Sequence, residues 1–409
     1  YGLGPDKVEL AGYPARVGAW DAIGDKTFLD NGPVWWSQAC HRSLYSHQLR
    51  AALQLALDDP RRAVTFASFA CAGAEVTYGL MLYYKGTEWA PDQPDKPQVS
   101  AAARTQCGGR TLQERKFTTT YNVAGKVPEM NDIFLLSCPR ASARKIDLVL
   151  LSVGGNDIGF SSLVANAMLA DEGVLRRLGG WMGRVFGREQ AEADLPVLEA
   201  RYKALNRALR GQLHVASTES DRVLLTGYPV MSLLEDGSSH CPSGGEGMTV
   251  FSEFALDRER AAEGERAADA LDKVMRGSAT THGWSYVDGH RKVFAGHGIC
   301  AGTASRGAND LRFPRKIDGQ WQPFNPSEYQ PYASRRRWFR TPNDAFLTGN
   351  YHVATSIMKN ALSFRRAAWL QLVLASTYSG AFHPTAEGQA VIADAVVHKA
   401  RAVLDKYDQ

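Results

Sequence analysis

The sequence has no long apolar run, little excess of charge of either sign and few cysteines. No apolar run approaches the ~18–20 residues that a membrane-spanning helix needs, so we expect no integral membrane segment. Lysine and arginine total 47 against 43 aspartate and glutamate, an excess too slight to predict a nucleic-acid partner. No signal-peptide pattern opens the chain, so we expect a soluble protein that is mature or trimmed.

Six cysteines occur in 409 residues, and none forms a CxxC pair or lies in a cluster of histidines, so we do not expect a zinc site. The even number is compatible with three disulfides, although the sequence leaves their pairing open. Because disulfides persist in oxidising compartments, we predict an exported protein, secreted or periplasmic, with buried free thiols as the alternative. No motif requires a metal or an organic cofactor, so none is expected.

The composition is ordinary for a globular protein, with 44% hydrophobic and 22% charged residues, which excludes disorder, collagen and coiled coil. Four apolar runs lack polar alternation and therefore predict strands buried on both faces of a parallel sheet, namely 63–69, 146–153, 222–228 and 284–288. Stretches with helical periodicity separate or follow them, namely 44–57, 189–215, 253–276 and 386–405. This alternation predicts the α/β fold class, with a doubly wound parallel sheet and helices on both faces.

The stretch 302–379 breaks this rhythm. It is rich in tryptophan, tyrosine, arginine and proline, contains the cluster RRRWFR at 335–340, and has a helical pattern over 351–374. We interpret it as a long insertion in a single domain that spans 1–409, covering the carboxyl edge of the sheet, where the loops of α/β proteins bind ligands. The cluster could form a subsite that binds a sugar or an acidic polymer. A solvated loop that its aromatic residues anchor to the body is an equally good interpretation.

Two of the predicted strands end in residues that suit an oxyanion site. The second leads into Gly154-Gly155-Asn156-Asp157, and the side chain of Asn156 can donate to an oxyanion, which contributes about 3–4 kcal/mol to a transition state. After the first comes Gly73, which allows a backbone N–H to approach a ligand closely. Simple turns are the alternative at both positions.

His383 precedes Pro384 and the start of the last predicted helix. An imidazole on a loop fixed by proline can act as a general base near neutral pH. A lone histidine of this kind is more often structural, so its interpretation depends on the motifs around it.

Six motifs, in this order, resemble the SGNH (GDSL-type) hydrolase family, in particular its secreted bacterial esterase and lipase branch. They are CHRS at 40–43, SFACAGA at 68–74, GGND at 154–157, TGYP at 226–229, FAGHGIC at 294–300, and HP at 383–384 with Gly388. The resemblance covers the chain from about Trp35 to its end, apart from 302–379. It implies a flavodoxin-like, three-layer α/β/α fold and disulfides that join Cys40 to Cys71, Cys107 to Cys138 and Cys241 to Cys300.

In that family a serine attacks the ester carbonyl, a histidine accepts its proton, and glycine and asparagine donors hold the oxyanion. The resemblance therefore implies that His383 is the base and that Gly73 and Asn156 are oxyanion donors. The expected substrate is an acyl or acetyl ester of a lipid or a glycan, either a small molecule or a polymer. A catalytically dead glycan-binding protein and an O-acyltransferase are the alternatives, and the oligomeric state is open.

The sequence departs from the family at the nucleophile, because it contains no Gly-Asp-Ser. Gly24-Asp25-Lys26 has lysine where serine is expected, and the pattern of residues 17–23 before it is compatible with a strand. Residues 1–6, YGLGPD, resemble the stretch that follows the nucleophile in relatives. In the family the serine ends the first strand, at the centre of the sheet, and none of the four strands predicted above corresponds to it. We therefore expect the serine upstream of Tyr1, with a degenerate Lys26 site as the alternative.

A second departure is that Gly380 stands where the family has the aspartate of its triad. We expect a main-chain carbonyl to orient His383 instead, and Asp157 to hold its turn. Three further interpretations concern nearby polar residues: Ser43 caps a helix, His297 is structural, and His41 with Arg42 borders the site.

Overall fold

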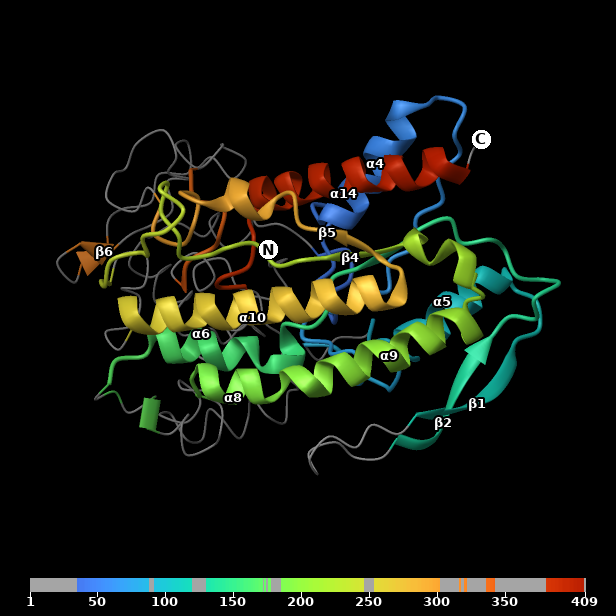
Figure 1. The fold of residues 1–409 in the computed structure, drawn as a ribbon, viewed down its shortest axis with the longest axis horizontal. Helices are drawn as coiled ribbons and strands as arrows, with labels where there is room; N and C mark the ends of the chain where they lie inside the picture. Colours follow the sequence, from blue (N-terminus) through green and yellow to red (C-terminus); the bar gives the residue numbers. More distant parts are fainter. Residues whose placement is uncertain are drawn as a thin grey trace.

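The fold is that of a computed structural model, which describes residues 35–87, 92–119, 130–171, 173, 176–177, 185–245, 254–301, 316–317, 320–321, 336–342 and 380–407. Helices and strands follow one another along this part of the chain (Figure 1). Its helices are α4 (His47–Asp58), α5 (Gln98–Cys107), α6 (Phe160–Met168), α8 (Arg188–Ala193), α9 (Leu195–Gln212), α10 (Arg258–His282) and α14 (Ala386–Tyr407). Its strands are β1 (Gln113–Thr119), β2 (Met130–Ser137), β3 (Val149–Leu151), β4 (Val223–Thr226), β5 (Ser285–Val287), β6 (Lys316–Ile317) and β7 (Gln320–Trp321).

A parallel sheet in the order β3-β4-β5 forms the centre of the molecule. Val149 pairs with Val223, and Leu224 with Ser285, so the strands lie in register with their carboxyl ends at one edge. All four residues of β4 are buried, as expected for an apolar strand between two neighbours. Three of the four predicted strands and the α/β fold class are thus confirmed.

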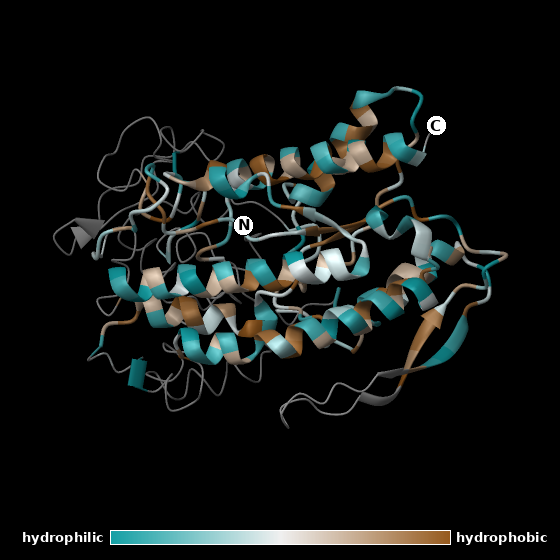
Figure 2. Cartoon of the chain, in the orientation of Figure 1, coloured by the Kyte–Doolittle hydropathy of each residue, from teal (hydrophilic) through white to brown (hydrophobic). Residues whose placement is uncertain are grey.

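Successive side chains of β4 enter different cores, which shows that helices cover both faces of the sheet. Leu224 belongs to the cluster formed with α4 and α14, whereas Val223 and Leu225 belong to the one formed with α9 and α10. In Figure 1, α14 and α4 lie on one side of the strands and α9 and α10 on the other. Figure 2 shows polar and apolar residues alternating around these helices, as expected where one side faces a core.

The side chain that caps α4 is not the one that the sequence predicts. Ser46, not Ser43, caps α4, because its side chain accepts a hydrogen bond from the backbone N–H of Leu49. Ser43 instead accepts from the backbone N–H of Tyr45 in the turn before the helix, so that prediction is wrong by one turn. The predicted helix over 189–215 is divided into α8 and α9 by Asp194.

The predicted strand at 63–69 is not one. These residues belong to no helix or strand, and all of them are exposed or only half-buried, although the sequence predicts burial on both faces. A strand needs a neighbour to satisfy its backbone N–H and C=O groups, and this run has no strand partner among the described residues. The run has the apolar pattern of a buried strand, but such a pattern forms a strand only where neighbouring strands are present.

Disulfides join Cys40 to Cys71, Cys107 to Cys138 and Cys241 to Cys300, which confirms all three expected pairs. The second lies next to the antiparallel pair of β1 and β2, which extends from the body in Figure 1 and is not among the predicted strands. Several predictions fall outside the described residues: the motifs at 1–6 and 24–26, the possible strand at 17–23, the helix at 351–374 and most of the insertion 302–379.

Candidate functional site

A cavity of about 2260 Å³ lies beside β3 and reaches the carboxyl ends of β3 and β4. Gly73, Asn156 and His383 all line it. Residues that are separated by 83 and 227 positions in the sequence therefore line one cavity. Edges of this kind are where open α/β sheets bind their ligands.

Asn156 begins a short 3₁₀ turn, Asn156–Ile158, directly after β3. Its side-chain amide donates one hydrogen bond to the carbonyl oxygen of Ala74, at 3.1 Å, and an amide group has a second N–H to offer. The backbone N–H of Gly155 donates to the hydroxyl of Tyr228 at 3.0 Å. Burial raises the pKa of Tyr228 to about 12, so this hydroxyl stays neutral and holds the turn that carries Asn156.

Gly73 has φ +81°, in the left-handed region that favours glycine. A Cβ atom there would lie 2.5 Å from the hydroxyl oxygen of Tyr84. That hydroxyl donates to the carbonyl of Ala72, as does the hydroxyl of Thr87 at 2.7 Å, so the loop is fixed beside Gly73. The disulfide of Cys71 holds the same loop two residues earlier.

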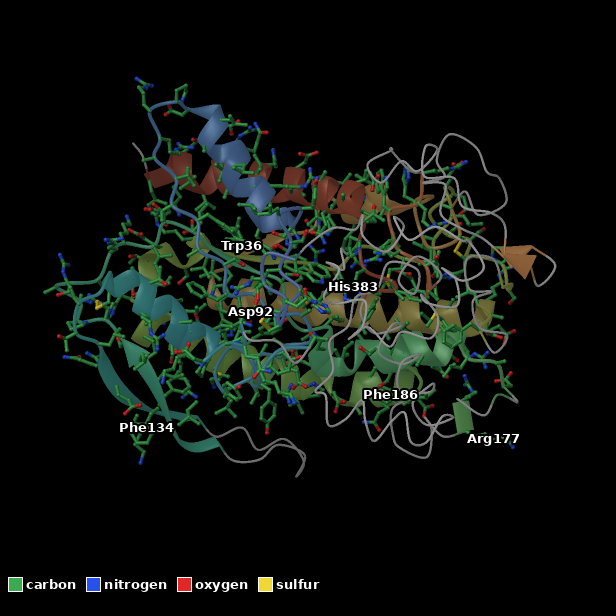
Figure 3. The ribbon with its side chains drawn as sticks, turned by 180° about the vertical axis from the view of Figure 1, so that it is seen from behind. Trp36, Asp92, Phe134, Arg177, Phe186 and His383 are labelled. Atoms are coloured by element: carbon green, nitrogen blue, oxygen red, sulfur yellow. A yellow bond between two sulfur atoms is a disulfide. The ribbon has the colours of Figure 1, made fainter. Side chains whose placement is uncertain are left out.

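His383 lies near the middle of the molecule (Figure 3), and its side chain is exposed to the cavity. Nδ1 is 3.0 Å from the carbonyl oxygen of Ala381, which is a main-chain acceptor of the kind predicted. Phe382, before it, has φ +63°, which is uncommon for an aromatic residue. Backbone bonds in both directions fix this strained loop: Arg340 donates to His383, and Phe382 donates to Arg340.

Burial in the surrounding protein lowers the pKa of His383, and the positive charge of Arg340 and the proximity of His41 lower it further. The carbonyl of Ala381 opposes this change. The imidazole is therefore neutral at pH 7. A carbonyl can only accept, so the proton lies on Nδ1, and Nε2 is the nitrogen with a lone pair for a substrate or nucleophile.

Asp157 holds its turn, as expected. Both of its carboxylate oxygens lie 3.2 Å from the backbone N of Val76, and Oδ1 is 2.6 Å from Nη1 of Arg201. The same nitrogen of Arg201 is 2.9 Å from the carboxylate of Glu75. Burial raises the pKa of Asp157, and the charge of Arg201 opposes that rise. These bonds join the loop of Gly73 to the turn of Asn156.

Arg340 also lines the cavity, and no catalytic or binding motif in the sequence points to it. It is only 8% exposed, and its segment pairs with the loop of His383 through an isolated bridge between Phe339 and Pro384. The cluster RRRWFR marks this residue in the sequence. The loop of His383, with which its segment pairs, lies more than 40 positions away, so the sequence does not show that the two meet.

The rest of that cluster has mainly packing roles. Trp338 stacks on His297 with 3.6 Å between ring centroids, and Phe339 is 1% exposed in the core. Nδ1 of His297 lies 2.6 Å from the carbonyl of Arg336, and His297 is absent from the cavity lining. These contacts agree with a structural role for His297 and favour the anchored-loop interpretation of 336–339.

His41 and Arg42 line the cavity, as predicted, and the guanidinium of Arg42 donates to the carbonyl of Ser68. Among the described residues, the hydrogen bonds of His383 are to backbone groups and none is to a serine hydroxyl. The described residues contain no group of acidic, histidine or cysteine side chains able to hold a metal ion. In the same part of the chain, no helix is long and apolar enough to cross a membrane.

No family model matches the sequence, and no curated protein matches it. The chain is similar to an extracellular lipase from Streptomyces rimosus, with 20% identity, 64% of this chain and 75% of that chain covered, and a TM-score of 0.37. It is also similar to a phospholipase A1 from Streptomyces albidoflavus NA297, with 19% identity, 70% and 82% covered, and a TM-score of 0.35. Similarity at this level establishes nothing about the activity of this chain, which we infer from the site itself.

Proposed function

We propose that the protein is an exported serine ester hydrolase of the SGNH type, which cleaves acyl or acetyl esters of a lipid or a glycan. The observation that carries this proposal is the convergence of Gly73, Asn156 and His383 on one cavity. A backbone N–H, a side-chain amide and a neutral imidazole are the groups that acyl transfer needs beside a nucleophile. Three disulfides support export, since they persist in oxidising compartments.

In the proposed reaction, Nε2 of His383 accepts the proton of a serine as its oxygen bonds to the ester carbonyl carbon. The carbonyl oxygen becomes an oxyanion, held by the backbone N–H of Gly73 and the second amide N–H of Asn156. The intermediate then expels the alcohol, which takes the proton from His383. Water, deprotonated by the same imidazole, releases the acid and regenerates the serine.

The serine itself belongs, in this proposal, to a segment upstream of Tyr1 that completes a flavodoxin-like sheet. The cavity beside β3 supports this placement, because it leaves space between β3 and residues 63–70. Residues 302–379 would then be an insertion in a single domain, over the carboxyl edge of the sheet. The bridge between Phe339 and Pro384 supports that position.

A non-catalytic glycan-binding protein is the second candidate, favoured by the lack of a serine partner for His383 among the described residues. An O-acyltransferase would use the same acyl-enzyme and differ only in its acceptor. Turnover of an ester would exclude the non-catalytic glycan-binding protein. The ratio of free acid to acylated sugar, measured with glucose present, distinguishes an O-acyltransferase from a hydrolase.

The test uses the polypeptide that includes the residues encoded directly upstream of Tyr1, with p-nitrophenyl acetate as substrate. His383→Ala is expected to abolish turnover, and Asn156→Ala to lower it by about 10²–10³-fold, the effect of removing one oxyanion donor. His398→Ala, on the exposed side of α14, serves as the matched control. A fluorophosphonate probe should label one serine in the active protein. Equal turnover by His383→Ala would overturn the proposal.

A further inference from the structure

Two tyrosine rings lie against the adjacent glycines that follow β3. A Cβ atom on Gly154 would meet the hydroxyl of Tyr202. A Cβ atom on Gly155 would lie 3.0 Å from Cζ of Tyr228 and 3.1 Å from its hydroxyl oxygen. Because glycine has no Cβ atom, each ring can approach the backbone of the turn that carries Asn156.

The two tyrosines use their hydroxyl hydrogens differently. The hydroxyl of Tyr202 donates to the carbonyl oxygen of Val153 at 2.6 Å, so its single hydrogen has an acceptor. The hydroxyl oxygen of Tyr228 instead accepts from the backbone N–H of Gly155 at 3.0 Å. A phenol hydroxyl that accepts still has one hydrogen to donate, and among the described residues the hydrogen of Tyr228 has no acceptor.

The surroundings of the two rings differ as well. Tyr202, on α9, is fully buried in the core and is not among the residues that line the cavity. Tyr228 follows β4, is only half-buried and lines the cavity together with Gly73, Asn156 and His383. A molecule bound in the cavity can therefore contact Tyr228 but not Tyr202.

Tyr228 is held in a fixed position beside the turn of Asn156. Its hydroxyl is bonded to Gly155, the residue before Asn156, and its main-chain carbonyl accepts from the guanidinium of Arg291. Pro229 follows it and restricts the backbone at this point. The second N–H of the Asn156 amide and the O–H of Tyr228 are therefore two available donors on neighbouring parts of one cavity wall.

The hydroxyl of Tyr228 keeps its hydrogen at neutral pH. Burial raises its pKa to about 12, the hydrogen bond from Gly155 opposes this rise, and the charge of Asp157 adds to it. A neutral hydroxyl in an apolar site can donate a hydrogen bond to an oxyanion without losing its proton.

We propose that Tyr228 is a third donor to the oxyanion, in addition to Gly73 and Asn156. This assignment rests on the function proposed above: the hydroxyl donates to the oxygen that was the ester carbonyl and keeps its own proton throughout. A hydrogen bond to a charged oxygen is stronger than one to a neutral carbonyl, so this donor stabilises the transition state more than the bound ester. The bond from Gly155 strengthens the effect, because hydrogen bonds in a chain polarise one another.

A pair of tyrosine variants tests the assignment in the active polypeptide described above. Tyr228→Phe is expected to lower kcat for p-nitrophenyl acetate about 10–100-fold with little change in KM, because the lost bond is strong only in the transition state. Tyr202→Phe makes the same chemical change one glycine earlier and outside the cavity. It should lower stability and leave kcat of the folded protein nearly unchanged. An unchanged kcat in Tyr228→Phe, or an equal loss in Tyr202→Phe, would overturn the assignment.

Tyr228→Phe also removes the acceptor of the Gly155 N–H, so a second measurement separates donation from a structural role. Fluorinated tyrosines at position 228 have more acidic hydroxyls, which after ionisation still accept from Gly155 but can no longer donate. We expect kcat to be lost at alkaline pH, at a pH that falls with each added fluorine, whereas the parent protein shows no such loss up to about pH 10. Identical pH profiles in the parent and fluorinated proteins would show that Tyr228 acts only through packing.

The failure of this assignment can be distinguished from the failure of the proposed function. Turnover that requires His383 but is unchanged in Tyr228→Phe would retain the hydrolase and exclude the third donor. If the parent polypeptide turns over no ester, the proposed function fails and this assignment fails with it.

Discussion

Nη1 of Arg201 lies 2.6 Å from Oδ1 of Asp157, and the Asp157 side chain is 1% exposed. The same nitrogen is 2.9 Å from the carboxylate of Glu75. One guanidinium of α9 thus connects the loop after residue 73 to the turn of Asn156. Because Asp157 also accepts from the backbone N–H of Val76, the spacing of the two proposed oxyanion donors depends on this buried pair.

We expect Asp157→Asn to destabilise the protein and to slow it. Arg201 keeps its pair with Glu75, so we expect the loss of one buried charge-assisted hydrogen bond, about 1.5–3 kcal/mol, measured as the free energy of unfolding in urea. In the active polypeptide, kcat should fall with little change in KM, since only the placement of Asn156 is affected. Arg104→Gln breaks an exposed pair with Asp95 and is the control, with an expected cost below about 1 kcal/mol. A similar cost for both variants would contradict the buried role.

The pH dependence of turnover should report the depressed pKa of His383. A base works when neutral, and because burial lowers the pKa below the usual 6.5, activity should persist below pH 6.5 before it is lost by protonation. Arg340→Gln removes a charge that lowers this pKa, so the acidic limb of kcat/KM should move to higher pH. Lys292→Gln removes an exposed charge as the control and should leave the profile in place. An unchanged limb in Arg340→Gln would argue that another group sets it.

The parts of the fold that the sequence predicted are those that local pattern determines. β4 is apolar without alternation and is buried on both faces, and α10 shows its helical period between the cap Asp257 and the left-handed Gly283. The run 63–69 has the same pattern as β4 but no ladder, because strand formation depends on a neighbour that the run itself does not encode.

The site residues that belong to short sequence motifs could be predicted. Those that reach the cavity through pairing between segments far apart in the sequence could not. Gly73, Asn156 and His383 each follow a recognisable local motif, and all three line the cavity. Arg340 reaches the cavity through a bridge between Phe339 and Pro384, which no local pattern shows. The pairing of β1 with β2 could not be predicted because β1, QERKFTT, is almost wholly polar and lacks the alternation of polar and apolar residues that indicates a strand.

Gly73 and Gly109 allow the cost of backbone strain to be separated from the cost of a blocked site. Their φ values are +81° and +83°, but a Cβ on Gly109 meets nothing within 4 Å, while one on Gly73 meets the hydroxyl of Tyr84. We expect Gly109→Ala to cost about 1–2 kcal/mol of unfolding free energy with unchanged turnover per folded molecule. Gly73→Ala should cost more and remove turnover, and Tyr84→Phe in the same chain should restore stability in part. Full turnover in Gly73→Ala would show that a Cβ at this position neither displaces the loop nor blocks the site.

The stability of the protein should fall in mildly acidic solution because of two buried histidines. His47 lies 2.7 Å from Oε1 of Gln389, and Nε2 of His290 is 2.9 Å from the carbonyl of Gly227. Burial lowers the pKa of each to about 4, from 6.5 in the unfolded chain. Between pH 6.5 and 4, the unfolded state therefore binds protons that the folded state does not.

The sign follows directly from this difference. The stabilising effect of the neutral state is complete above pH 6.5, is lost as the pH falls toward 4, and changes no further below both values. Each histidine contributes up to roughly 3 kcal/mol over this window. We expect His47→Gln to flatten the dependence of unfolding free energy on pH, measured in urea at pH 7 and 4.5, while His398→Gln on the exposed side of α14 leaves the slope unchanged. If the slope of His47→Gln equals that of the parent chain, His47 is protonated in the folded state and its burial does not govern acid stability.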